Sequence, residues 1–319
     1  MEQKLVTWSQ EQKNEIARRC GRVAVFLGGD SAEREVSLKS GTAVLNALQS
    51  VGVDAFAFDA TRKNLKQLAE HKFDRVFLVL HGRGGEDGTI QGYLDVLGVP
   101  YTGSGVLASS LAMDKIRTKQ LWLGKGLSTP EFVELSNRSN WQQVMADLGP
   151  EVCVKPAHEG SSIGVRKVTT AEELKEAYQQ ASELDALILA ERWIKGPEYT
   201  VSILNDRVLP VIGLRTDHTF YDYDAKYISN DTKYMLPSGL SFEKEEEIKA
   251  LSKIAFDAVG CKTWGRVDVM ADAEGRFWLL EVNTTPGMTD HSLVPMAAAH
   301  DGIDFGELVL RIVAETLES

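Results

Sequence analysis

The sequence has few cysteines, few histidines and no long apolar segment. It contains three cysteines and six histidines in 319 residues, and the cysteines stand far apart at positions 20, 153 and 261. This spacing fits no zinc site, so we expect three free thiols of the kind found in the cytosol. No apolar run approaches the ~18 residues that a membrane-spanning helix needs. The first residues also lack the apolar core of a secretory signal, so neither an anchor nor a leader is expected.

Positive charge is also scarce. The chain has 35 Lys and Arg against 46 Asp and Glu, a formal net charge of -11. A nucleic-acid surface needs a clustered excess of Lys and Arg, so the composition predicts no such partner. It does not exclude a small anionic ligand held by a few cations. At roughly 150 residues per domain, the length indicates about two domains, each able to bury a core.

Two common nucleotide-binding fingerprints are missing. The segment 28–33 does not have the G-x-G-x-x-G spacing, and the loop after Lys155 is not followed by Gly-Lys-Ser/Thr. What is present from residue 22 onward is an alternation of strands and helices. Short apolar runs end near residues 27, 58 and 80, and helical patterns separate them at 34–50 and 62–70. This order predicts a parallel sheet. Ligands gather where parallel strands end, so loops 28–33 and 81–88 are expected at one edge.

The rest of the chain has a mixed pattern. A capping box at residues 170–173 predicts a helix in an α+β stretch that runs to about residue 194. Beyond it we expect several strands, an acidic helix at 242–259, a hairpin and a final helix at 304–317. Residues 1–21 are polar and form an N-terminal extension with weak helical spacing.

The hairpin contains the strongest candidate site. Side chains alternate faces along a strand, so Arg266 shares a face with Asp268, and Glu281 with Asn283. A turn at 271–275 allows a register with Arg266 opposite Glu281, which would bring Asp268, Glu281 and Asn283 onto one face. Two carboxylates and an amide oxygen are ligands suited to Mg²⁺ that bridges phosphates. The alternative is a solvated polar face.

Three other segments carry weaker signals. After Lys155, a Gly/Ser loop offers N–H groups and hydroxyls that could bind phosphate, although such a loop can be an ordinary turn. The strand that ends at Glu191 could present its backbone to an adenine edge, or be a plain strand. Residues 219–237 are aromatic and polar with little periodicity, which suits a lid that excludes water or a long surface loop.

Eight segments, taken in their order along the chain, resemble the sequence motifs of proteins with the ATP-grasp fold. More narrowly, they resemble those of the D-alanine–D-alanine ligase family. The resemblance extends from about residue 23 to about residue 317. It rests on residues 28–37, 80–88, 101–105, 113–115, 155–162, 220–227, 265–268 and 281–295.

The resemblance implies a fold of α/β and α+β class with three domains. Residues 22–103 would be an N-terminal, parallel-sheet (pre-ATP-grasp) domain that binds substrate, and 104–194 a central ATP-grasp subdomain. Residues 195–319 would be the C-terminal ATP-grasp subdomain, with the metal site and the lid loop. Residues 1–21 have no counterpart in the family pattern. The resemblance also implies that the protein is a homodimer in the cytoplasm.

The reaction that the resemblance implies joins two D-alanine molecules at the expense of ATP. ATP would phosphorylate the carboxylate of the first D-alanine, and the amine of the second would attack the resulting acyl phosphate. The products would be D-alanyl-D-alanine, ADP and phosphate, for peptidoglycan precursor synthesis. ATP and two Mg²⁺ (or Mn²⁺) ions would take part.

The resemblance also assigns residues to the two substrates. Glu33 would bind the ammonium of the first D-alanine, and Ser161 and Tyr227 would close the lid by hydrogen bonds near it. Arg266 and the backbone N–H of Gly287 would stabilise the developing oxyanion. His81 and Glu86 would line the first-substrate site, while Ser292 and the Leu293 backbone would hold the second carboxylate.

The nucleotide and the metal ions have their own implied residues. The phosphates would be neutralised by Lys115, Lys155 and Lys226. Adenosine would be bound by Glu191, Trp193, Ile194 and Glu198. The metal ligands would be Asp268, Glu281 and Asn283.

Some positions depart from the family pattern, and three alternatives stay open. Asp30, His158 and Thr285 stand where the family often has a small polar residue, a basic residue and Ser. A D-alanine–D-lactate ligase is one alternative, against which Tyr227 argues. Another ATP-grasp carboxylate–amine ligase and a non-catalytic nucleotide-binding protein are the others. The latter would be expected to lose Arg266 or a metal ligand.

Overall fold

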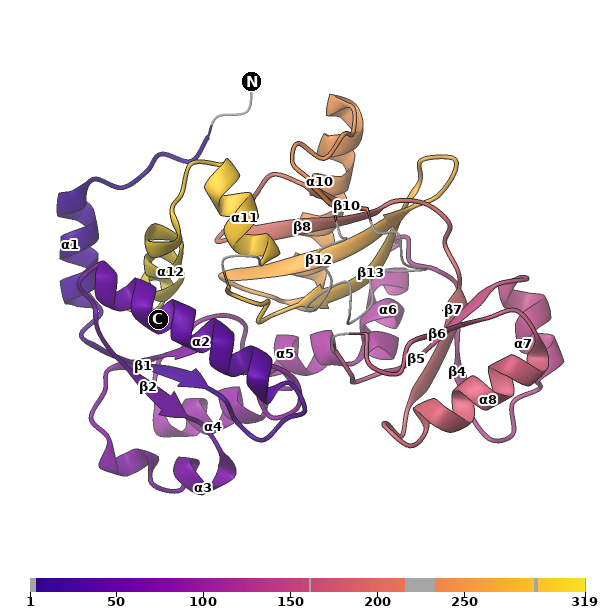
Figure 1. The fold of residues 1–319 in the computed structure, drawn as a ribbon, viewed down its shortest axis with the longest axis horizontal. Coiled ribbons are helices and arrows are strands. Elements are labelled where there is room, and N and C mark those ends of the chain that lie inside the picture. The colour runs from indigo at the N-terminus through magenta and orange to yellow at the C-terminus, as the bar shows by residue number, and fades with distance from the viewer. Residues whose placement is uncertain (1–3, 161, 216–232, 290–291, 319) are drawn as a thin grey trace.

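The computed structural model describes residues 4–160, 162–215, 233–289 and 292–318 (Figure 1). It contains three sheets, each built from a separate stretch of the chain. Within the described residues, no helix is long and apolar enough to cross a membrane. The predicted domain limits are not tested by these observations and stay a prediction.

The first sheet is parallel, as predicted. Its order is β2-β1-β3, formed by Asp54–Asp59, Arg22–Leu27 and Arg75–Leu78. The third strand ends two residues earlier than expected, although Val79 still donates to the carbonyl of Phe26. Helix α2 (Arg34–Ser50) follows β1 in the chain, and helix α4 (Thr89–Leu97) follows β3.

The helix predicted at residues 62–70 is divided in two. The chain forms α3 (Arg62–Leu65) and then a 3₁₀ turn, η1 (Leu68–Glu70). The Tyr93 hydroxyl donates to the carbonyl of Leu65 at 3.0 Å. A continuous helix would need that carbonyl for its own N–H four residues later, so the contact is consistent with the interruption.

The second sheet is antiparallel. Its order is β4-β7-β5-β6, and helices α7 and α8 share its core. The elements are β4 (Phe132–Leu135), α7 (Trp141–Leu148), β5 (Val152–Pro156), β6 (Arg166–Val168), α8 (Ala171–Ala181) and β7 (Ile188–Arg192). The capping box before α8 is half formed. Thr170 accepts from the N–H of Glu173, but the Glu173 carboxylate binds Thr169 instead of Thr170.

The third sheet has the order β11-β10-β8-β12-β13, with β9 paired to β8. Its strands are β8 (Glu198–Leu204), β9 (Arg207–Val208), β10 (Ile212–Arg215), β11 (Lys233–Met235), β12 (Trp264–Ala271) and β13 (Phe277–Asn283). The acidic helix α10 (Phe242–Val259) has the predicted limits and packs on this sheet. Helices α5 (Val106–Met113) and α6 (Lys115–Gly124) join the same core.

The predicted register of the β12–β13 hairpin is wrong. Arg266 lies opposite Asn283 instead of Glu281, and Asp268 lies opposite Glu281. The ladder shifts between Asp268 and Val269, where a β-bulge inserts one extra residue into β13. The turn also starts one residue later than expected, because the Asp272 carboxylate accepts the N–H groups of Glu274 and Arg276.

Both ends of the chain return to the first sheet. Helices α11 (Leu293–His300) and α12 (Phe305–Ala314), followed by the 3₁₀ turn η2 (Glu315–Leu317), share a core with β1 and α2. Figure 1 shows α1 (Gln10–Arg19) beside α12. The fully buried carboxylate of Glu307 accepts from the Trp8 N–H at 3.0 Å and forms ion pairs with Lys13 and Arg311. The described part of the N-terminal extension is therefore integral to this core.

Candidate functional site

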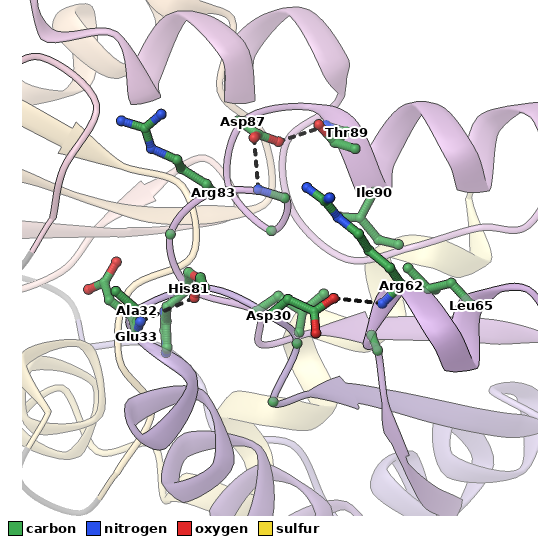
Figure 2. A pocket seen from close by; sticks show the side chains of 18 of the residues that line it. Asp30, Ala32, Glu33, Arg62, Leu65, His81, Arg83, Asp87, Thr89 and Ile90 are labelled. Carbon is green, nitrogen blue, oxygen red and sulfur yellow. Dashed lines mark hydrogen bonds between the residues drawn. The ribbon is translucent and has the colours of Figure 1, made fainter. Parts of the chain in front are cut away.

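A cavity of about 700 Å³ lies between the loops that follow β1 and β3. Figure 2 shows Glu33 and His81 toward one side of it, and Arg62, Leu65 and Ile90 toward the other. Loops 28–33 and 81–85 both line it, which confirms the prediction that they share one edge of the parallel sheet.

Glu33 sits where two loops approach closely. It occupies the position before α2, at the carboxyl end of β1. A Cβ atom added to Gly82 would lie 2.9 Å from a Glu33 carboxylate oxygen, and one added to Gly160 would lie 3.0 Å from it. A side chain at either position would crowd this carboxylate, and Gly82 also has a positive φ of 70°, so backbone from the first sheet and from the second meets at Glu33.

His81 is a buried, neutral side chain. Its Nε2 lies 3.4 Å from Ser40 Oγ, which in turn accepts the N–H of Met288 at 3.2 Å. Burial lowers the pKa of His81 to about 4, so the ring is uncharged near neutral pH. This chain of contacts joins the first-sheet edge to the loop after β13.

Glu86 is a carboxyl group in an unfavourable place for charge. One oxygen accepts the N–H of Gly82 at 2.6 Å. Burial, and next the negative charge of Glu33, raise the pKa of Glu86 to about 8, against the opposing effects of the Gly82 N–H and Lys115. Glu86 is therefore mostly protonated at neutral pH and can donate a hydrogen bond.

The hairpin brings the three predicted metal ligands together. Asp268 accepts two bonds of 2.8 Å from Arg266, one of 2.8 Å from Thr200 and one of 3.0 Å from the Asn283 amide. Glu281, opposite Asp268 in the ladder, lies 3.4 Å from the Lys115 ammonium. The bulge therefore changes the pairing and still leaves these side chains close to one another.

This donor set fits a hard divalent cation. It consists of two carboxylates and an amide oxygen, the ligand types that Mg²⁺ prefers. The Asn283 amide presents its nitrogen to Asp268, and a half turn would present its oxygen instead. Within the described residues, no cluster of three or more His, Cys, Asp or Glu side chains could hold a metal. A metal here would thus need the amide as a ligand.

A buried carboxylate between two lysines lies on the second sheet. Lys155 on β5 is 2.6 Å from Glu191 on β7, and Lys119 on α6 is 2.8 Å from the other Glu191 oxygen. Burial opposes ionisation of Glu191, yet the two lysines hold its pKa below the usual range. Lys119 also donates to Thr129 at 2.6 Å.

Lys119 was missed by the sequence reasoning. It is completely buried, and burial lowers its pKa to about 8 against the attraction of Glu191. The signal that could have found it is its spacing, because it follows Lys115 by four positions and so shares a helix face with it.

The remaining predicted residues lie at two places. Trp193 packs under Lys167 with 4.9 Å from the ammonium to the ring, Ile194 is buried, and Glu198 begins β8. In the loop before α11, Ser292 accepts the Thr289 N–H at 2.9 Å. A Cβ on Gly287 would lie 3.2 Å from Ser292 Oγ, and Leu293 is the first residue of the helix. Ser161, Lys226 and Tyr227 lie outside the described residues.

Comparison with known proteins identifies the family. A family model described as "D-ala D-ala ligase C-terminus" matches residues 121–314, more than half of the chain. The chain belongs to the D-alanine–D-alanine ligase family. A second model of this family, described as "D-ala D-ala ligase N-terminus", matches residues 57–104.

Individual members of the family match over nearly the whole chain. A D-alanine–D-alanine ligase of Marinobacter nauticus is 60% identical over 303 residues, covering 95% of this chain and 93% of that protein. The enzyme of Ectopseudomonas mendocina is 60% identical over 299 residues, covering 94% and 96%.

Solved structures of the family superpose closely. The D-alanine–D-alanine ligase of Bacillus anthracis gives a TM-score of 0.84 at 35% identity, covering 93% of this chain and 97% of that one. The VanG D-Ala:D-Ser ligase of Enterococcus faecalis gives 0.81 at 30% identity, covering 93% and 99%. The predicted ATP-grasp fold class and the family resemblance are confirmed.

The raised pKa of Glu86 predicts a pH-dependent stability. Between its ordinary pKa of 4.5 and about 8, the native protein keeps a proton that the unfolded chain has released. The contribution of Glu86 to the free energy of unfolding of the wild type therefore falls as the pH rises through this window. Glu86→Gln lacks this proton. Its free energy of unfolding, minus that of the wild type, should rise from about pH 5 to about pH 8 and then level off.

Urea denaturation of both proteins at several pH values measures this difference. If the difference stays constant across the window, Glu86 ionises in the native protein as it does in the unfolded chain.

Proposed function

We propose that this protein joins two D-alanine molecules in an ATP-dependent reaction that passes through D-alanyl phosphate. The products are D-alanyl-D-alanine, ADP and phosphate, and the dipeptide serves peptidoglycan precursor synthesis. The observation that carries the proposal is that Lys115 connects two parts of the site. It contacts the side-chain group of Arg266, Asp268 and Glu281, and it also contacts the loop that approaches Glu33. Lys115 lies 3.4 Å from Glu281 and donates to the Glu159 carbonyl at 2.7 Å, one residue before the glycine that approaches Glu33.

The first D-alanine binds with its ammonium on Glu33. Glu33 lines the cavity, so a small substrate can reach the carboxylate. His81 stays neutral and Glu86 mostly protonated, so neither competes with Glu33 for the ammonium.

The nucleotide binds between the second and third sheets. Lys115 and Lys155 neutralise its phosphates, and Glu191, Trp193, Ile194 and Glu198 surround the adenosine. Lys155 is paired with Glu191 at 2.6 Å, and it must leave this partner to reach a phosphate. Lys119 stays on Glu191 at 2.8 Å, so the buried carboxylate keeps a counter-charge during the exchange.

The metal site consists of Asp268, Glu281 and Asn283, which would hold two Mg²⁺ (or Mn²⁺) ions. Bound there, the ions would disperse the negative charge of the phosphates during transfer. Arg266 is bonded to Asp268 and so is fixed beside this group.

The second D-alanine binds at the loop before α11. Ser292 and the Leu293 N–H hold its carboxylate at the start of a helix, where N–H groups are unpaired. Arg266 and the Gly287 N–H stabilise the oxyanion that forms when its amine attacks the acyl phosphate. We also assign Ser161 and Tyr227 to closure over the first substrate and Lys226 to the γ-phosphate, on the family resemblance alone.

A direct assay tests the reaction. Purified protein with ATP, Mg²⁺ and D-alanine should release inorganic phosphate together with one dipeptide per phosphate, measured by a coupled phosphate assay and mass spectrometry. Parallel reactions offer D-serine or D-lactate as the acceptor, because one structural relative is named a D-Ala:D-Ser ligase. Phosphate release that needs D-serine or D-lactate, with little from D-alanine alone, would reassign the acceptor. No amino-acid-dependent release at all would refute the ligase activity.

Arg266→Ala tests the oxyanion role. Turnover should fall by about 10²–10³-fold, the loss expected when one donor to an oxyanion is removed. ATP binding, measured by titration calorimetry, should change little. The matched control is Arg276→Ala, which removes an exposed arginine from the same hairpin. Turnover of Arg266→Ala close to that of the control would show that Arg266 has no part in the chemistry.

We propose that the protein works as a homodimer in the cytoplasm, as the resemblance implies. Its three cysteines are free and buried, which is compatible with a reducing compartment. The side chains of Val96 and Leu107, on the contacting helices α4 and α5, are 86% and 72% exposed and are candidates for the dimer contact.

Sedimentation velocity tests the dimer. The wild type should sediment as a dimer, and a Val96→Asp, Leu107→Asp double variant should shift toward the monomer, because charge would replace apolar contacts. Val6→Asp, a change at another exposed apolar position, is the control. A monomeric wild type would contradict the proposal.

A further inference from the structure

The loop after β3 carries an arginine that reaches the second sheet. Arg83 lies in the 81–88 loop, and its guanidinium is 3.0 Å from the Glu159 carboxylate and 3.3 Å from that of Asp185. It also donates to the Leu184 carbonyl at 3.5 Å. One side chain thus bridges the edge of the first sheet to two separate segments of the second.

From these contacts we infer that Arg83 is a positioning residue for the first substrate. It holds the start of loop 158–164 against Glu33 through Glu159 and Asp185. The inference rests on the proposed function, because it takes the Glu33 carboxylate as the site of the substrate ammonium. The sequence patterns alone assigned no role to Arg83.

The far side of this bridge is firmly anchored. The Asp185 side chain is 2% exposed, and it accepts the backbone N–H of His158 at 2.8 Å and lies 2.9 Å from His158 Nδ1. Burial opposes ionisation of Asp185, yet the His158 hydrogen bonds hold its pKa below the usual range. His158 also lies 3.3 Å from the carboxylate of Asp114, the N-cap of α6. Arg83 therefore attaches to a rigid group.

Glu159, at the start of loop 158–164, is held by two different residues. The Glu159 side chain binds Arg83, and its backbone carbonyl accepts from Lys115 at 2.7 Å. The next residue is Gly160, and a Cβ added to it would lie 3.0 Å from a Glu33 carboxylate oxygen. A shift of Glu159 must therefore move the backbone beside Glu33 and the carbonyl that orients Lys115.

The size of the effect follows from exposure. The Arg83 side chain is 52% exposed, so each of its ion pairs is worth little for overall stability. Replacement of Arg83 should leave the fold intact, but the start of loop 158–164 would no longer be held beside Glu33. We expect weaker binding of the first D-alanine with little change in thermal stability.

Steady-state kinetics of three variants test the inference. Arg83→Met, Glu159→Gln and the double variant are compared with the wild type, using the full-length protein with ATP and Mg²⁺. The Michaelis constant for D-alanine at the first site should rise about tenfold in each single variant. The double variant should be no worse than Arg83→Met, because Arg83→Met already removes the contact with Glu159. The turnover number should stay within about twofold, and the Michaelis constant for ATP should rise less than that for D-alanine, because Lys115 keeps its contact with Glu281.

Arg62→Met is the matched control. Arg62 is an exposed arginine that lines the same cavity from α3, and it forms no hydrogen bond or ion pair with the described residues of loop 158–164. The same charge is lost in both variants, so an equal rise in the first-site Michaelis constant would overturn the positioning role. Additive effects in the double variant would overturn it too.

Hydrogen exchange gives a readout that does not depend on activity. Amides of residues 157–165 should exchange faster in Arg83→Met than in Arg62→Met, while exchange in the core strands stays unchanged. Equal exchange would overturn the inference even if the enzyme is active. If the wild type releases no phosphate with D-alanine, the proposed function fails, and the exchange result still decides whether Arg83 holds the loop.

Discussion

The close approach of two backbone segments to one carboxylate is the constraint on which the site depends. Glu33 is met by Gly82 from the first sheet and Gly160 from the second, and a Cβ atom at these positions would lie 2.9 and 3.0 Å from a carboxylate oxygen. The first contact needs the loops after β1 and β3 at one edge of a parallel sheet. The second needs the two sheets to be held in a fixed relation. The glycines, the Arg83 bridge and the Lys115 bond to the Glu159 carbonyl all serve this one approach.

A second consequence concerns the protonation of neighbouring groups. Burial acts in opposite directions on two titratable side chains near Glu33. It lowers the pKa of His81 to about 4 and raises that of Glu86 to about 8, so both favour their neutral forms. Neither side chain therefore brings a full charge of its own next to Glu33, the carboxylate proposed to bind the substrate ammonium.

Much of this arrangement could be predicted from the sequence, because it depends on local patterns. The alternation of apolar strands and helices indicated the parallel sheet, and the carboxyl-end rule placed loops 28–33 and 81–85 together. The hairpin register could not be predicted, since a bulge leaves no mark on the alternation of two mostly apolar strands. The Leu65 carbonyl, where the predicted helix is interrupted, accepts from the Tyr93 hydroxyl, and the Arg83 bridge joins residues far apart in the chain. Contacts of that kind are set by tertiary packing and have no periodic signature.

The charge balance connects the acidic composition to an anionic ligand. A net charge of -11 opposes the approach of a nucleotide at long range, where salt also screens the field. At short range the cations of the site are already paired: Lys155 and Lys119 with Glu191, Lys115 with Glu281, and Arg266 with Asp268. These carboxylates keep buried lysines charged and oriented, because an unpaired ammonium in such surroundings would lose its proton. In the proposed function a phosphate takes over part of this pairing, and two of the carboxylates, Asp268 and Glu281, then become available to metal ions. On this proposal the acidic residues of the site hold the cations that would bind a triphosphate. An excess of negative charge in the chain is therefore compatible with the binding of an anion.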